Sequence, residues 1–257
     1  MDVGPIHLST EMLIWAGFLL CGGLLIVFRD WWVTLSALLG EYLLLCVLLS
    51  RFPFVPRDLV IGPLAISQIV LAKGVTGLIV VAMLAITVAS RRRLRQPDDE
   101  RDLDEITAAR LRWAARRVAR RGGKGRVRLS TYLLPLAALA VLAVATHALA
   151  ELYPLARGPT LPEVPWRYVD LAWYWMGLSG LLIILLAQEM QEVSVGLLLC
   201  IGSVDLLYVA LSKSVGLLAI GLLSAVSILL ALGSAYLAQL FYLRLRRWQL
   251  PSAEEWD

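Results

Sequence analysis

The sequence predicts an all-α polytopic membrane protein of seven transmembrane helices, and three observations support this fold class. Hydrophobic residues make up 59% of the 257-residue chain, whereas soluble domains average about 45 to 50%. The mean hydropathy is +0.74. Apolar stretches long enough to cross a bilayer alternate with short polar connections. Most Lys and Arg residues lie in 91–128 and 244–247, which places the N-terminus outside and the C-terminus in the cytoplasm.

The first three spans are expected at 12–28, 31–50 and 64–90. The first has no basic leader or small-residue cleavage site, so we expect a retained span and no signal peptide. Arg29 and Asp30 form a short cytoplasmic turn before Trp31 and Trp32, which suit an interfacial aromatic belt. The proline-containing stretch 51–63 is expected to be an extracytoplasmic loop.

A basic segment, 91–128, follows the third span and is expected to form a cytoplasmic linker helix. Acidic residues gather near its start and arginines near its end, the order that the helix dipole favours. Apolar residues scattered among the charges leave two alternatives open, a solvated linker and a helix lying on the membrane surface or on a neighbouring subunit. Membrane topology already explains these arginines, so we expect no nucleic-acid binding.

The second half of the chain repeats the organisation of the first half. A fourth span at 132–150 leads to a proline-rich extracytoplasmic loop at 151–170, and three further spans follow at 171–187, 193–212 and 215–242. In each half, a span and a short charged turn precede a span with a central carboxylate and a longer span that ends in arginines. We therefore expect two parallel three-helix repeats that the fourth helix joins. The predicted divisions are a first repeat at 1–90, a linker at 91–128, the linker helix and loop at 129–170, a second repeat at 171–247 and a cytoplasmic tail at 248–257.

Three charged residues lie inside predicted spans: Glu41, Lys73 and Asp205. Lys73 lies about 14 Å inside the span 64–90 at about 1.5 Å per residue, and an ammonium there costs at least about 2.5 to 3.5 kcal/mol. It therefore needs a counter-ion or a water-filled cavity. Two interpretations remain open for the three residues, a structural polar contact between helices and a proton relay.

A second group of polar residues forms weaker candidates for a polar path. Serine and glutamine side chains within spans can hydrogen-bond between helices or hold water, and carboxylates in a cytoplasmic turn could mark a proton entry point. Lys213 is expected at the outer end of two spans, where its ammonium reaches water. These candidates are Ser67, Gln68, Glu189, Glu192, Ser203 and Lys213.

The sequence contains no pattern of an enzyme active site or of a cofactor site. Its three cysteines, Cys21, Cys46 and Cys200, lie in separate apolar stretches, and its two histidines, His7 and His147, lie far apart. There is no Ser/His/Asp grouping, phosphate-binding glycine loop or zinc motif. We expect a chain that is not an enzyme by itself and holds no cofactor or metal.

The stretch LAISQIVLAKGVTGLIVVAMLAITVASRRR, which contains Lys73, resembles the third helix of the E-type membrane protein family of hydrogenase-4 and formate hydrogenlyase complexes. The order of elements after it is also similar. The second half resembles the small K-type protein of respiratory complex I, which has three helices, and the C-type protein of Mrp cation antiporters. One position departs from this pattern. The resemblance implies a glutamate where Ile201 stands, and the carboxylate here is Asp205, four residues later on the same helix face.

The resemblance implies an accessory subunit of a complex I-like assembly in the cytoplasmic membrane. Its partners would be antiporter-like membrane subunits, cytoplasmic iron–sulfur or hydrogenase-like subunits, and lipids. Glu41, Lys73 and Asp205 would then contribute to a relay of protons or sodium ions at mid-membrane depth. Two alternatives stay open: a stand-alone permease built from the two repeats, and a structural anchor that docks a cytoplasmic partner through 91–128.

Overall fold

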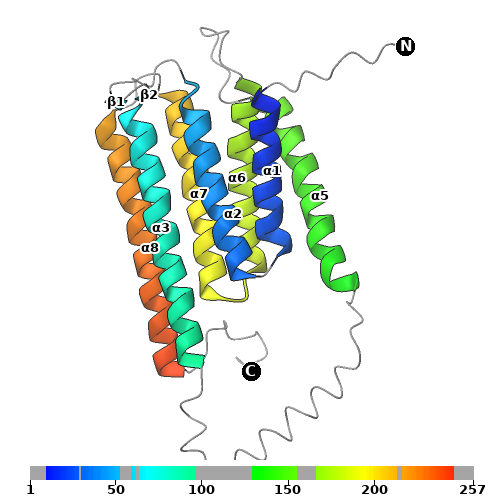
Figure 1. The fold of residues 1–257 in the computed structure, drawn as a ribbon. Coiled ribbons are helices and arrows are strands. Elements are labelled where there is room, and N and C mark those ends of the chain that lie inside the picture. The colour runs from blue at the N-terminus through cyan, green and yellow to red at the C-terminus, as the bar shows by residue number, and fades with distance from the viewer. Residues whose placement is uncertain are drawn as a thin grey trace, which may run out of the picture.

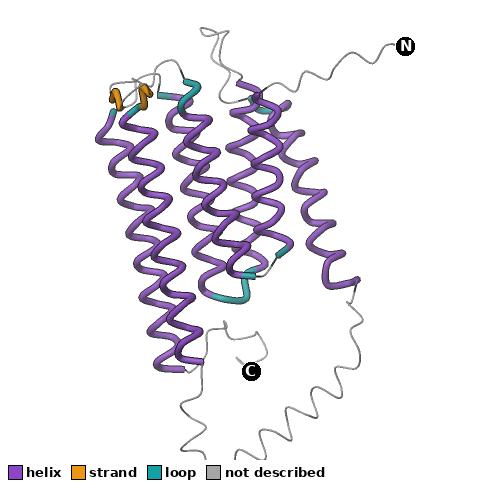
Figure 2. The backbone as a smooth tube through the Cα atoms, viewed as in Figure 1, coloured by secondary structure: helices purple, strands orange, loops and turns teal. Residues whose placement is uncertain are grey.

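A computed structural model describes residues 10–28, 30–52, 59–61, 64–95, 129–154, 166–212 and 216–245. In this part of the chain, seven helices and one short hairpin are present (Figure 2). The helices are α1 (Thr10–Val27), α2 (Trp31–Leu49), α3 (Gln68–Arg95), α5 (Leu129–Leu152), α6 (Trp166–Leu186), α7 (Met190–Leu211) and α8 (Leu217–Leu245). The antiparallel hairpin pairs β1 (Leu59–Ile61) with β2 (Leu64–Ile66).

The helices form two layers of three. Within the layers, α2 packs between α1 and α3, and α7 packs between α6 and α8. Between the layers, α1 packs on α6, α2 on α7 and α3 on α8 (Figure 1). Each helix therefore lies against its counterpart and runs in the same direction, as the prediction of two parallel repeats requires. We call the end of the bundle that carries β1 and β2 the hairpin end, and the opposite end, with the α1–α2 and α6–α7 turns, the turn end.

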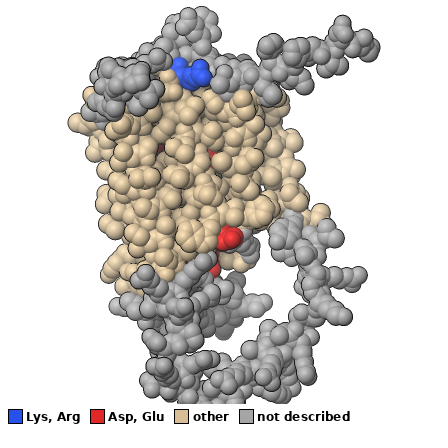
Figure 3. Space-filling model, in the orientation of Figure 1, with Lys and Arg blue, Asp and Glu red and all other residues tan. Residues whose placement is uncertain are grey.

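The helical architecture confirms the predicted fold class. Six described helices, α2, α3, α5, α6, α7 and α8, are long and apolar enough to cross a membrane, and α1 contains a shorter apolar stretch, Met12–Val27. A broad band of other residues separates the coloured Lys and Arg atoms near the hairpin end from coloured Asp and Glu atoms near the turn end (Figure 3). This band fits a bilayer interior, so the chain is a multi-pass membrane protein.

Two predicted boundaries at the hairpin end are wrong. The third span was expected to begin at Leu64, but Leu64–Ile66 pair with Leu59–Ile61, and α3 begins at Gln68. Lys73 therefore lies only about 7.5 Å from the start of its helix. Likewise, the predicted loop 151–170 ends early, because α6 already begins at Trp166. Most of the linker 91–128 lies outside the described residues, although α3 extends to Arg95.

Close backbone contact joins α6 to α7. A Cβ atom added to Gly180 would lie 2.6 Å from the carbonyl oxygen of Gly196, and a Cβ on Gly196 would lie 2.6 Å from that of Gly180. Only glycine permits this approach. A second contact connects the two layers, because the indole N–H of Trp175 in α6 donates to the carbonyl oxygen of Phe18 in α1 at 2.9 Å. These contacts pack α6 closely against α7 and connect the second repeat to the first.

The linker helix α5 is fastened to α6 mainly at the hairpin end. There Tyr174 donates its hydroxyl to the carbonyl oxygen of Tyr153 at 2.9 Å, and Arg167 forms a 2.8 Å ion pair with Glu151. Toward the turn end α5 diverges from the bundle (Figure 1). Only one end of this helix is therefore held by polar contacts among the described residues.

Candidate functional site

Lys73 and Asp205 form a buried ion pair between the two repeats. The Lys73 Nζ in α3 donates to Asp205 Oδ2 in α7 at 2.5 Å, and the two side chains are 1% and 2% exposed. Residues 132 positions apart in the sequence thus meet inside the bundle. The pair meets the need of the lysine for a counter-ion in an apolar medium.

Polar groups from α2 and α8 surround this ion pair. Tyr42 in α2 is buried, and its hydroxyl lies near Asp205 and Ser227 without a hydrogen bond of normal geometry among the described residues. Its ring lies on Gly77 of α3, where an added Cβ would approach the ring Cγ to 2.6 Å. Cys46 lies near Lys73 and donates its thiol to the carbonyl oxygen of Val70 at 3.5 Å. The ion pair therefore lies where four helices, α2, α3, α7 and α8, converge.

Asp205 keeps one oxygen available. Oδ2 accepts the lysine ammonium, while Oδ1 has no hydrogen-bond partner within the described part of the chain. A buried acceptor without a partner is costly. This oxygen is the position at which a proton or a water molecule would relieve that cost.

Glu41 lies apart from the ion pair. Its side chain is 1% exposed and faces α1, close to Cys21 and the backbone amide of Gly22. Neither carboxylate oxygen makes a hydrogen bond of normal geometry to the described residues. The structure therefore brings together two of the three intramembrane charges and leaves the third isolated on the other face of α2.

The serine candidates take structural positions. Ser67 precedes α3 and its Oγ accepts the backbone N–H of Ile69 at 3.2 Å, which is the contact of a helix N-cap. Ser203 donates its hydroxyl to the carbonyl oxygen of Trp173 at 2.8 Å and so connects α7 to α6. Gln68 is exposed on the first turn of α3. Nothing in these contacts tests their assignment to a polar path.

The carboxylates of the α6–α7 turn cap a helix. The Glu192 Oε2 accepts the backbone N–H groups of Gln188 at 2.6 Å and Glu189 at 3.3 Å, which completes a capping box at the start of α7. Both glutamates lie at the turn end, as the sequence predicted. A role in proton entry stays a prediction. Lys213 lies outside the described residues.

Sequence reasoning missed Tyr42, Cys46 and Ser227. A tyrosine in the middle of a span is a detectable signal, because its hydroxyl seeks a polar partner when the ring is buried. Cys46 and Ser227 carry no comparable signal, since such residues usually pack or bond within their own helix. The Ser227 hydroxyl does donate to the carbonyl oxygen of Leu223 at 3.1 Å.

Among the described residues, the buried charged side chains are the Lys73–Asp205 ion pair, the isolated Glu41 and Asp170 of α6. Asp170 accepts the indole N–H of Trp173 at 3.2 Å. No group of three or more His, Cys, Asp or Glu residues that could hold a metal ion occurs among the described residues. The Lys73–Asp205 pair places an ammonium donor directly against a carboxylate acceptor inside the bundle.

Comparison of the chain with family models, with curated proteins and with solved structures gives no match.

Proposed function

We propose that this chain is an accessory membrane subunit of a complex I-like, ion-translocating assembly, in which Lys73 and Asp205 form part of a relay for protons or sodium ions. Antiporter-like subunits would lie beside it in the cytoplasmic membrane, and iron–sulfur or hydrogenase-like subunits would supply the driving reaction. The chain itself would hold no cofactor and catalyse no reaction.

One observation carries this proposal: the ion pair that connects α3 of the first repeat to α7 of the second. Ionisable residues within a membrane are expensive, and they commonly mark ion or proton pathways. Parallel repeats also occur in membrane transporters that bind ions or substrate near the bilayer midplane, so this arrangement fits the stand-alone permease as well.

The chemistry of such a relay follows from the two groups. Proton arrival at the free Oδ1 of Asp205 would neutralise the carboxylate and weaken its hold on the Lys73 ammonium. The Lys73 ammonium would then release a proton or reorient toward another acceptor, and the positive charge would move along the relay. Tyr42 and Ser227 offer hydroxyl groups beside this position.

Identification of the partners tests this proposal. The tagged chain is extracted from its native membrane in a mild detergent, passed through size exclusion, and analysed by mass spectrometry. We expect antiporter-like subunits and iron–sulfur proteins to remain bound. A chain that purifies alone or only with copies of itself would contradict the proposal.

A structural anchor is the second candidate, and the enclosure of the ion pair favours it. A salt bridge that is almost fully buried can serve only to fix the register of two helices. In that case, substitution of the pair would leave ion movement unchanged, while deletion of 91–128 would abolish assembly.

A further inference from the structure

A pocket at the turn end separates α5 from the rest of the bundle. Five helices, α1, α2, α5, α6 and α7, line it together with Phe28 of the turn between α1 and α2. Its empty volume is about 670 Å³, part of which is open to the surroundings.

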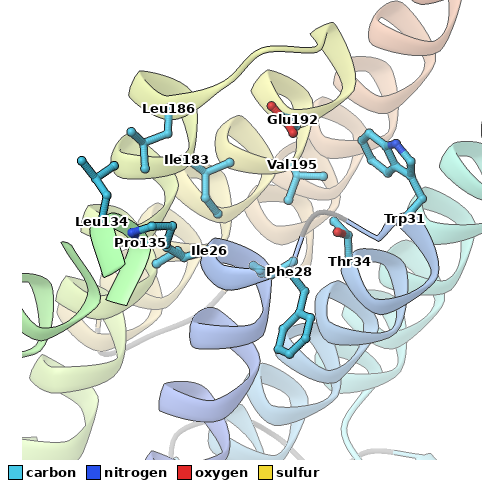
Figure 4. Close-up of a pocket in the computed structure, with 11 residues that line it drawn as sticks. Ile26, Phe28, Trp31, Thr34, Leu134, Pro135, Ile183, Leu186, Glu192 and Val195 are labelled. Atoms are coloured by element: carbon cyan, nitrogen blue, oxygen red, sulfur yellow. The ribbon is translucent and has the colours of Figure 1, made fainter. Parts of the chain in front are cut away.

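The two sides of this pocket differ in polarity. Leu134 and Pro135 of α5 and Ile183 of α6 form an apolar wall, while Glu192 and Trp31 lie across from the α5 side (Figure 4). The Glu192 Oε2 accepts the hydrogen bonds that cap α7, and its other oxygen takes no part in this cap. A ligand with an apolar tail and a cationic head would match both sides.

The position of the pocket limits what can enter it. It lies at the end of the membrane-spanning bundle, beside a tryptophan of the expected interfacial belt. The helix α5 is fastened at the opposite end by Tyr174 and Arg167, and Pro135 lies toward the end at which α5 diverges from the bundle (Figure 1). A lipid occupant would therefore come from the membrane leaflet at the turn end.

We propose that this pocket binds one phosphatidylethanolamine molecule, with an acyl chain between α5 and α6 and its ammonium group at Glu192. Apolar walls favour the acyl chain in proportion to the methylene groups that they cover. The carboxylate selects an ammonium headgroup over an anionic one. This site is distant from the Lys73–Asp205 pair along α7, and the proposal does not depend on the proposed function.

Matched tryptophan substitutions on α6 test the position of the acyl chain. Ile183 is 8% exposed and lines the pocket, whereas Leu185, two residues later, is 81% exposed on the outside of the same helix. Native mass spectrometry of the full chain, purified in mild detergent and supplied with phosphatidylethanolamine, counts the bound lipid. We expect one retained lipid in the wild type and in Leu185→Trp. Ile183→Trp should bind about tenfold more weakly for every two methylene groups displaced.

A second substitution tests the headgroup without altering the packing. Glu192→Gln should lower the preference for phosphatidylethanolamine over phosphatidylglycerol by about two- to fivefold, the effect of losing one partly exposed ion pair. Equal retention of both lipids by the wild type would overturn the proposed headgroup contact. Equal lipid retention by the Ile183 and Leu185 variants, or a partner protein segment found in the pocket in the purified assembly, would overturn the lipid site.

Discussion

The two buried carboxylates on α2 and α7 have opposite surroundings although their helices occupy equivalent places in the two repeats. Asp205 in α7 accepts the Lys73 ammonium and lies near the hydroxyl of Tyr42. Glu41 in α2 is equally buried but faces α1, where the described residues give it no hydrogen bond of normal geometry. Each repeat therefore buries an acid in its middle helix, and the two acids have different electrostatic surroundings.

This difference distinguishes a buried charge that stabilises helix packing from a buried carboxyl group that does not. A paired charge contributes to the packing of the helices that carry the pair, so removal of either partner leaves a costly buried charge. An isolated carboxyl group such as that of Glu41 makes no such contact, so helix packing does not account for its burial in an apolar site. Four sets of substitutions test this contrast between the paired region and the unpaired region, in decreasing order of the stability loss that we expect.

Lys73→Met should produce the largest loss of stability. It leaves Asp205 buried without a counter-ion, and breaking a buried pair costs about 3 to 5 kcal/mol in free energy of unfolding. The double variant Lys73→Met, Asp205→Val should recover most of this loss, because removing both charges avoids the unpaired group. Denaturant unfolding in detergent measures both variants. Equal stability of the single and the double variant would show that the pair does not stabilise the fold.

Gly77→Ala should weaken the packing around the paired region. The new methyl group would meet the ring of Tyr42 at 2.6 Å, so α2 and α3 must move apart or the ring must shift. We expect a loss of about 1 to 3 kcal/mol, typical of overpacking. Gly221→Ala is the control, because a Cβ there meets nothing within 4 Å. If both alanine variants unfold at the same denaturant concentration, Tyr42 is not held as described.

Trp175→Phe should cause a smaller loss in the unpaired region. It removes the indole donor to the Phe18 carbonyl oxygen, which is a hydrogen bond worth about 0.5 to 1.5 kcal/mol. The exposed Trp32 provides a control, because Trp32→Phe leaves the interior intact. Thermal unfolding, measured as the loss of monomeric protein on heating, distinguishes the two variants. A control variant as unstable as Trp175→Phe would argue against the importance of this contact.

Glu41→Gln should have the smallest effect on stability, about 0.5 kcal/mol or less, because the amide has nearly the shape of the carboxyl group and its introduction breaks no ion pair and no hydrogen bond of normal geometry to the described residues. The matched amide variant Asp205→Asn should cost several times more, since it leaves Lys73 buried without its anion. The same unfolding experiment compares the two amides. A large loss for Glu41→Gln would reveal a partner for Glu41 that the described residues do not provide.

Most of the fold could be predicted because long apolar stretches separated by polar turns determine membrane helices directly. The ends of α2 and α7 lie near charged or capping residues, and both were predicted closely. The strand Leu64–Ile66 was not, because three apolar residues next to an apolar helix carry no separate signal in hydropathy. The prolines before Trp166 favoured a loop that continued to residue 170, so the start of α6 at Trp166 was not predicted.

The pairing within the candidate site could not be predicted from the sequence. Lys73 and Asp205 stood out because charges are rare in spans, but their contact depends on which faces of α3 and α7 meet. The isolation of Glu41 depends equally on the rotation of α2 about its axis. Tyr42 is adjacent to Glu41 in the sequence, but its side chain lies near Asp205 whereas that of Glu41 faces α1. Neighbouring residues of a helix point in different directions, so the two side chains lie apart.

Ion translocation by the intact assembly shows whether the Lys73–Asp205 pair belongs to a relay. Membrane vesicles that contain the complete complex are energised by its redox reaction, and ion movement and electron transfer are recorded together. The Lys73→Met, Asp205→Val variant should assemble and transfer electrons but lose most of its ion translocation. Undiminished translocation by this variant would contradict the relay and leave the pair a structural contact between the two repeats.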